Sequence, residues 1–408
     1  MGIILYIIVA GITVYLATKV KTTKEVPSSI NGRILLTRSQ LNNQIMLLAI
    51  FLILFCLSAF RLNVGNDYAK YVEFMHLIRC KSYVPTEIGF NALVYAIYYV
   101  CNQENFLLVF AIFAFFTQLF FLHAIKLQGV HFGWCFFLYM SLGYYFMSFT
   151  TVRYYLALSI ALLSIPFLLN KEWGKFILLI VAGSLFHKSL LVVLALYIVC
   201  IIPLKKWMLA LASAFFVSCL FLSDLYLKVV VFLYPSYEDT EYLAGGTSVI
   251  SILRCMGVLI LFLICFSELY GEKLSVGNLW RFLQGAERPQ NTSAYEVTED
   301  RSKGLVVIRF YFVSNLLALC LYVFCSFVPV LSRIGHYLMI TQVLMIPYII
   351  CNLPEKSKKR RLLSVLVVVA CVGYFLIFLR RGSGDGIRIL PYQTFFFHDM
   401  VNILSDVN

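Results

Sequence analysis

Long apolar runs alternate with short polar stretches along almost the whole chain. Runs of this length can cross the roughly 30 Å hydrocarbon core of a bilayer as helices. The pattern therefore predicts an all-α, polytopic integral membrane protein, with residues 1–408 forming a single membrane domain. The predicted apolar segments are residues 2–17, 44–60, 88–101, 105–125, 131–149, 153–169, 174–186, 189–202, 207–223, 249–269, 309–329, 334–352 and 362–379.

Basic residues indicate which loops stay in the cytoplasm, because Lys and Arg concentrate on that side of a membrane. The loop after the first segment is basic, as are Lys205-Lys206 and residues 355–361. Counting crossings between these three loops predicts about 12 transmembrane helices, with both termini outside.

Two stretches do not fit the expected number of full crossings. Segment 88–101 would be about 21 Å long as a helix, so we predict a re-entrant or interfacial helix there. Residues 174–202 have to leave the cytoplasm and return, and the natural break at 186–189 places His187 at the outer apex. Irregular backbone at membrane depth is tolerated only against protein or a water-filled cavity.

Two loops are longer than the others. Residues 61–104 are predicted to form an outer loop that holds a short amphipathic helix and the re-entrant segment. Residues 270–308 mix Gly, Pro, Asn and both signs of charge, which predicts a flexible cytoplasmic loop.

Composition narrows the class of protein. With 61% hydrophobic and 13% charged residues, the chain is not a soluble domain. The net charge of +13 is dispersed over short loops, which favours contact with the lipid bilayer and excludes a nucleic-acid patch. The 12 cysteines lack metal-binding spacing, and no Walker, DxD, HExxH or GxSxG motif is present. We therefore expect no metal and no cofactor.

Several basic side chains nevertheless fall at the outer ends of apolar runs: Arg61, Arg153, His187-Lys188 and Arg333. An ionisable group at membrane depth indicates a functional site by default. Their summed charge suits a lipid diphosphate better than a bare sugar.

The first such group is Arg61-Leu-Asn-Val-Gly65-Asn-Asp67-Tyr68. Arginine offers a planar fork for a phosphate, and a carboxylate can accept a proton or a sugar hydroxyl. Gly65 allows a tight turn that would direct both inward. The alternative is structural, with Arg61 reaching the headgroups and Asp67 capping the next helix.

The second and third groups are Ser148 to Tyr155 and Gly183 to Ser189. Arg153 would open a helix at the outer face, where a helix N-terminus and a guanidinium together attract anions. His187 at a helix break can act as a general base. An interfacial arginine and a structurally satisfied histidine are the alternatives.

The fourth group lies later in the chain. Arg333 and His336 stand one helical turn apart, and Arg254 follows an acidic, tyrosine-rich loop with Glu241 and Tyr242. Aromatic faces and carboxylates suit a hydroxyl-rich ligand, and they suit a membrane-surface loop equally well.

The order of these motifs resembles the EpsG family of Wzy-like exopolysaccharide and O-antigen polymerases. The resemblance covers roughly residues 44–200 and rests on the matching positions Arg61, Gly65, Asp67, Tyr68, Glu87, Arg153 and His187. It implies a bacterial inner-membrane glycosyltransferase with a glycosyltransferase-C-like membrane fold. Such enzymes move a growing chain from undecaprenyl diphosphate to the non-reducing end of a new lipid-linked repeat unit at the periplasmic face.

We accordingly expect a metal-independent glycosyltransferase. The residues expected to deprotonate the acceptor hydroxyl are Asp67, His187 and Glu87. The residues expected to hold the diphosphate are Arg61, Arg153, Arg333, Arg254 and Lys188. The residues expected to contact sugar are Tyr68, Tyr154, His336, Glu241 and Tyr242.

The expected partners are an undecaprenyl-diphosphate-linked oligosaccharide and the bilayer, with a membrane protein that regulates chain length as a candidate. Two alternatives remain open at this point. A flippase or exporter would bind the same diphosphate without covalent chemistry, and a ligase-like transferase would attach a finished chain to another acceptor.

Overall fold

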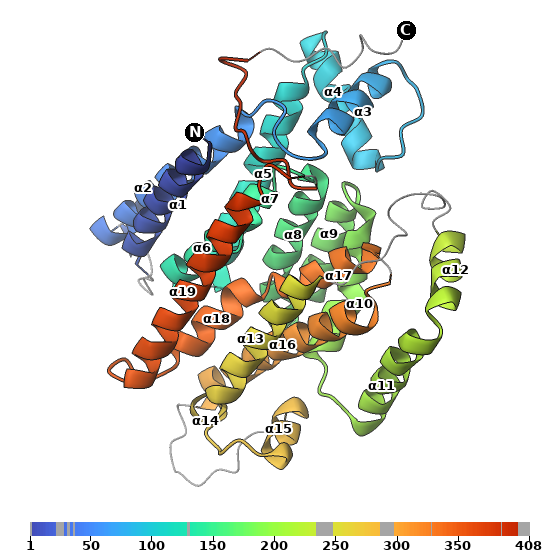
Figure 1. Ribbon diagram of the computed structural model, residues 1–408. Helices are drawn as coiled ribbons and strands as arrows, with labels where there is room; N and C mark the ends of the chain where they lie inside the picture. Colours follow the sequence, from blue (N-terminus) through green and yellow to red (C-terminus); the bar gives the residue numbers. More distant parts are fainter. Residues whose placement is uncertain are drawn as a thin grey trace. The chain divides into compact units, whose positions relative to one another are not determined.

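Every predicted apolar segment is helical over most of its length in the computed structural model (Figure 1). The structure describes residues 2–21, 28–30, 33–35, 37–128, 131–233, 248–285, 298–327, 329–384 and 386–398. The chain divides into two compact units, which are described separately. Unit 1 comprises residues 1–166, 177–190 and 361–408, and unit 2 comprises residues 167–176 and 191–360.

The elements of unit 1 come from both ends of the sequence. Its helices are α1 (Gly2–Lys19), α2 (Arg38–Ala59), α3 (Tyr68–Arg79), α4 (Ile88–Cys101), α5 (Phe106–Gln128), α6 (Phe132–Ser141), α7 (Tyr144–Met147), most of α8 (Val152–Leu169), most of α9 (Trp173–Ser184) and most of α19 (Lys358–Arg380). The short 3₁₀ helix η1 (Lys188–Leu191) follows α9. An antiparallel hairpin, β1 (Ser28–Ile30) and β2 (Arg33–Leu35), is an exception to the all-helical prediction.

Unit 2 is built around one long helix, α16 (Thr298–Phe324). The other helices of unit 2 are α10 (Val192–Ile201), α11 (Lys206–Phe221), α12 (Ser223–Leu233), α13 (Val249–Ile264), α14 (Phe266–Tyr270), α15 (Val276–Leu283), α17 (Pro329–Met339) and α18 (Gln342–Cys351). Helices α10, α11, α13, α17 and α18 all pack against α16. This contact pattern makes α16 the core of the unit.

Seven helices within the described residues are long and apolar enough to cross a membrane. They correspond to α1, α2, α5, α8, the part of α16 from Lys303, the joined α17–α18 stretch from Arg333, and α19. Six further apolar helices have only 10–17 residues. The chain is thus a multi-pass membrane protein, whereas the count of about 12 crossings and the outward termini stay predictions.

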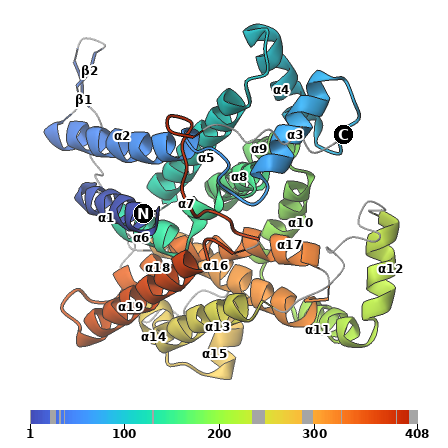
Figure 2. The same ribbon diagram turned by 45° about the horizontal axis from the view of Figure 1, so that its top comes forward.

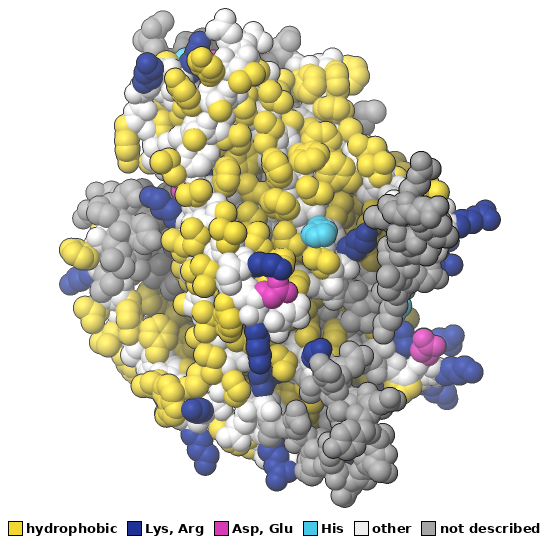
Figure 3. Space-filling model, turned by 180° about the vertical axis from the view of Figure 1, so that it is seen from behind, with side chains coloured by type: hydrophobic (Ala, Val, Ile, Leu, Met, Phe, Trp, Pro, Cys, Tyr) yellow, Lys and Arg dark blue, Asp and Glu magenta, His cyan; other side chains and the backbone are white. Residues whose placement is uncertain are grey.

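Helix packing in unit 1 separates lipid-facing from buried surfaces. Helix α1 lies beside α2, and α3 lies beside α4 (Figures 1 and 2). Hydrophobic side chains cover much of the part of the face that is drawn in colour in Figure 3. Apolar side chains of α1, α2 and α19 are widely exposed. By contrast, α8 is mostly buried, and its small residues Ala157, Ser159 and Ala161 are fully buried. Small side chains allow helices to approach closely in a membrane protein.

The predicted break in segment 174–202 is confirmed. Helix α9 ends at Ser184, and η1 begins at Lys188, so His187 lies between two helical pieces. Residues 61–104 contain the helices α3 and α4, and α4 has the bounds of segment 88–101, whereas an outer loop with an interfacial and a re-entrant segment stays a prediction. The stretch 270–308, predicted as a flexible cytoplasmic loop, contains the helix α15, whose Phe282 packs against the rings of Phe262 and Phe312.

The C-terminal segment folds back onto unit 1. The amide of Gly65 donates to the carbonyl of Arg388 at 2.8 Å, and the hydroxyl of Tyr6 donates to the carbonyl of Ile389 at 2.7 Å. The last part of the described chain therefore completes the loop that follows α2.

Candidate active site

The start of α4 is held against the break between α9 and η1. Gly89, in the first turn of α4, donates its amide hydrogen to the carbonyl oxygen of Leu185 at 2.8 Å. A Cβ atom at position 89 would lie 2.7 Å from that oxygen, so only glycine allows this approach. The Glu87-Ile-Gly89-Phe90 sequence thus brings the N-terminus of α4 to the residues around His187.

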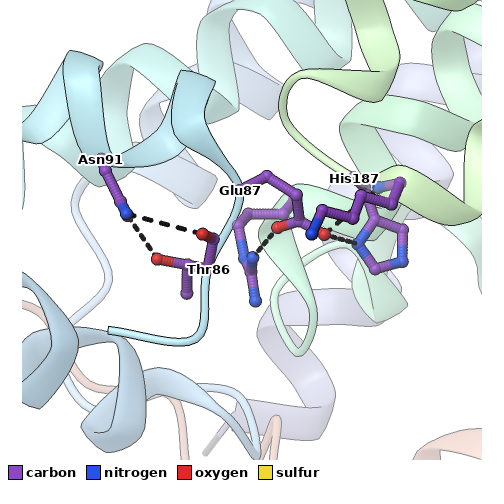
Figure 4. Close-up of polar contacts among 6 residues, drawn as sticks. Thr86, Glu87, Asn91 and His187 are labelled. Carbon is purple, nitrogen blue, oxygen red and sulfur yellow. Dashed lines mark hydrogen bonds and ion pairs between the residues drawn. The ribbon is translucent and has the colours of Figure 1, made fainter. Parts of the chain in front are cut away.

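Glu87 is the centre of a polar cluster at this junction (Figure 4). It occupies the N-cap position of α4, but its side chain does not cap that helix. Its Oε2 accepts a hydrogen bond from Nη1 of Arg153, and its Oε1 lies 3.4 Å from Nδ1 of His187. The backbone amide of Lys188 also donates to Oε1, at 3.2 Å. Three segments distant in sequence therefore meet at one carboxylate.

Arg153 lies in the first turn of α8, where the prediction placed it. Its guanidinium stacks over the rings of Tyr71 and Phe90, at 5.4 and 5.3 Å from the ring centroids. Such cation–π contacts add to the ion pair with Glu87 when the groups are desolvated. The Arg153 side chain is only 14% exposed, and its Nε has no hydrogen-bond partner among the described residues.

His187 presents one edge to Glu87 and packs edge-on against Tyr154, with ring centroids 5.5 Å apart. Both ring nitrogens are buried and make no hydrogen bond within the described part of the chain, so Nδ1 meets Glu87 as an ion-pair contact. A carboxylate beside Nδ1 favours the tautomer that carries the proton there, which leaves Nε2 as an acceptor. The contact with Glu87 therefore orients an imidazole whose second nitrogen can accept a proton.

The surroundings keep Glu87 ionised. Burial raises the pKa of its carboxyl, but the close contact with His187, the charge of Arg153, the charge that His187 carries when protonated and the Lys188 amide together lower it more. The net effect lowers the pKa of Glu87 to about 2. A carboxylate with so low a pKa is a weak base near neutral pH, so this geometry favours His187 as the proton acceptor.

Arg61 does not join this cluster. Its side chain is 1% exposed and donates to the carbonyl of Val64 at 3.3 Å, to the hydroxyl of Ser58 at 3.0 Å and to the Ser58 carbonyl. The rings of Phe110 and Phe149 flank the guanidinium at 5.3 and 5.1 Å. This placement favours a structural role over the predicted direct contact with a diphosphate.

Tyr68 and Asp67 follow in the same motif. Tyr68 is fully buried, and its ring stacks on Phe110 with centroids 4.3 Å apart, so the predicted sugar contact has no access to its face. Asp67 is half-buried and accepts a hydrogen bond from Asn66 at 3.3 Å. The motif's glycine, Gly65, has a φ of +112° and fits the predicted tight turn.

The remaining predicted residues belong to unit 2. Arg254 lies in α13, and its Nε donates to Oε1 of Gln342 at 2.9 Å. His336, in α17, lies within electrostatic reach of Arg254, and Arg333 lies one turn before it, half-buried. Glu241 and Tyr242, in the acidic loop, lie outside the described residues.

Lys188 and Tyr154 complete the set in unit 1. The Lys188 side chain is exposed, while its backbone amide binds Glu87. Tyr154 is buried against His187. The structure thus brings together five predicted residues, namely Glu87, Arg153, Tyr154, His187 and Lys188.

Sequence reasoning missed the aromatic support and the buried amides. Tyr71 and Phe90 were part of apolar patterns without any role at Arg153. Asn315 and Gln342 are fully buried inside apolar helices of unit 2. A polar amide inside an apolar run itself indicates a specific contact, and this signal could have identified Asn315 and Gln342.

Comparison with known proteins gives a family match. The model described as the EpsG family matches residues 44–394, which is most of the chain. No curated protein and no solved structure matches the chain.

Proposed function

The chain belongs to the EpsG family, and on that premise we propose that it is a membrane polymerase of lipid-linked saccharide repeat units. The observation that carries the proposal is the Glu87–His187–Arg153 cluster, which combines an oriented imidazole with a buried guanidinium. The proposed substrates are two undecaprenyl-diphosphate-linked saccharides at the periplasmic face of the inner membrane. One donates its glycan, and the other accepts it.

In the proposed reaction, a hydroxyl at the non-reducing end of the acceptor attacks the anomeric carbon of the donor. A new glycosidic C–O bond forms as the bond from that carbon to the diphosphate oxygen breaks. The hydroxyl proton passes to Nε2 of His187, and the electron pair of the broken bond leaves on the lipid diphosphate. Glu87 stabilises the imidazolium that forms, because its carboxylate lies 3.4 Å from Nδ1.

Arg153 supplies positive charge beside the proton acceptor. Glu87 holds one of its terminal nitrogens, and the aromatic rings of Tyr71 and Phe90 fix the plane of the guanidinium. A guanidinium held in place stabilises charge that develops on a leaving group without reorganisation at the moment of reaction. The exposed side chain of Lys188 adds a second positive charge to the same region.

The test is polymerisation of a purified lipid-linked repeat unit by the full chain in detergent or liposomes. His187→Ala and Arg153→Ala should each reduce the ladder of products on the order of 100-fold or more, as expected for loss of a general base or of a charge-stabilising group. Gln118→Leu is the matched control, since Gln118 is fully buried in α5 and bonds Tyr139 at 2.9 Å.

Product length separates this proposal from its alternative. A flippase would move one repeat unit across the bilayer without lengthening it, so wild-type protein would give no ladder. Full laddering by both the His187→Ala and the Arg153→Ala variants would remove the proposed roles of the cluster.

A further inference from the structure

Unit 2 contains a chain of buried polar groups that ends at Arg254. Nε of Arg254 donates to Oε1 of Gln342 at 2.9 Å, and Nε2 of Gln342 donates to Oδ1 of Asn315 at 2.7 Å. Nδ2 of Asn315 donates to the carbonyl oxygen of Cys255 at 3.0 Å. The chain of hydrogen bonds connects the first half of α13 and the start of α18 with the middle of α16.

The direction of every hydrogen bond in this chain is fixed by its ends. The Cys255 carbonyl can only accept, so Asn315 has to turn its NH₂ group towards it. The Asn315 oxygen then faces Gln342, which has to present its own NH₂ group there and its oxygen to Arg254. Arginine has donors only, so it closes the chain without an alternative arrangement.

The buried amides of this hydrogen-bonded chain need a reason beyond helix packing. Asn315 and Gln342 are 0% exposed, whereas Arg254 is half-buried. An unpaired buried amide costs about 1–3 kcal/mol, so apolar residues would stabilise the helix contacts more simply. The amides lead from a fixed backbone carbonyl to a guanidinium that is partly exposed.

We propose that Gln342 and Asn315 are positioning residues that orient Arg254 to bind the diphosphate of a lipid-linked substrate. This inference rests on the proposed function, in which two lipid diphosphates have to be bound. Fixing Nε through Gln342 sets the plane of the guanidinium, and a planar fork recognises phosphate oxygens by paired hydrogen bonds. His336, within electrostatic reach of Arg254, belongs to the same surroundings.

The proposal predicts coupling between Gln342 and Arg254, which a double-mutant cycle measures. The probe is undecaprenyl diphosphate, titrated into the full chain in detergent. Gln342→Met should weaken binding about tenfold, and Arg254→Met should weaken it more. The double variant should bind no more weakly than Arg254→Met alone, because Gln342 acts only through Arg254.

Controls separate positioning from stability. Gln118→Leu removes an equally buried glutamine of unit 1 and should leave binding unchanged, even where the melting temperature falls. Arg254→Lys keeps the charge but lacks the Nε donor, so it should weaken binding as much as Gln342→Met does. This variant tests the inference while it keeps both buried amide side chains, should Gln342→Met fail to fold.

The outcomes are distinct. Three results would each overturn the inference: equal weakening by Gln342→Met in the wild-type protein and in the Arg254→Met variant, unchanged binding by Arg254→Lys, or no binding of the probe by wild-type protein. Coupled binding without any product ladder would support the inference and remove the proposed polymerase activity.

Discussion

Replacing Glu87 with glutamine removes the one carboxylate that faces Arg153 and His187 in the described cluster. The amide keeps the shape of the side chain but leaves the Arg153 guanidinium, 14% exposed, without its counter-charge. Removing one partner of a buried ion pair costs about 3–5 kcal/mol, because the other charge stays buried and uncompensated. Glu87→Gln should therefore destabilise unit 1 as well as abolish activity.

The pKa of Glu87 gives a second magnitude for the stabilisation that the same contacts provide. A fall from 4.5 to about 2 corresponds to about 3 kcal/mol of preference for the ionised form, since a tenfold change in proton affinity is worth about 1.4 kcal/mol. The folded-state pKa is lowered, so this stabilisation is fully present above pH 4.5. The stabilisation is lost as the pH falls from 4.5 to about 2, which is the pKa of Glu87 in the folded protein.

The assay is chemical or thermal unfolding of the purified protein in detergent over this pH range. Wild-type protein should lose about 3 kcal/mol between the two limits, while Glu87→Gln should lack that component of the pH dependence. The double variant Glu87→Gln, Arg153→Met should recover part of the lost stability, because neither charge then remains buried. A Glu87→Gln variant as stable as wild type at pH 7, or a double variant as unstable as the two losses added together, would refute the reasoning.

Two glycine substitutions test the backbone approaches that build unit 1. Gly65→Ala should lower the yield of folded protein, because Gly65 has a φ of +112° and a Cβ there would overlap the Phe149 carbonyl oxygen. A normal yield and a normal melting temperature of this variant would contradict the prediction. Gly89→Ala should push the Leu185 carbonyl away and reduce polymerisation more than stability, and unchanged turnover would show that this contact does not position the cluster. Gly174→Ala is the control for both, since no atom apart from its chain neighbours and its own helix backbone lies within 4 Å of the position of its Cβ.

The local features of the fold could be predicted from the sequence. An apolar run bounded by polar residues predicted both ends of α4. The residues Phe186-His187-Lys188-Ser189 indicated the break after α9, because polar groups there separate two apolar segments. Helix lengths were harder to predict, since Gly143 and Thr341 divide apolar runs that hydropathy alone treats as continuous.

The candidate site could be predicted only as a list of residues. Arg153 pairs with Glu87 across 66 positions of sequence, and hydropathy contains no information about such partners. The same limitation explains Arg61, which was expected at a ligand but lies between Phe110 and Phe149. A basic residue at the end of an apolar run can bind a ligand or pack inside the protein. Aromatic residues far away in the sequence decide which of the two it does.

The return of the C-terminal segment has a consequence for biosynthesis. Arg61 forms an antiparallel bridge with Thr394, and Tyr6 binds the carbonyl of Ile389, 383 positions away. The ribosome therefore has to synthesise all of unit 2 before unit 1 can form these contacts. The first helices enter the membrane early but wait for residues 388–394 to complete their surroundings. Pairings of such long sequence separation form late, so a chain stalled before Thr394 leaves the Arg61 loop unfinished and exposed to quality-control proteases.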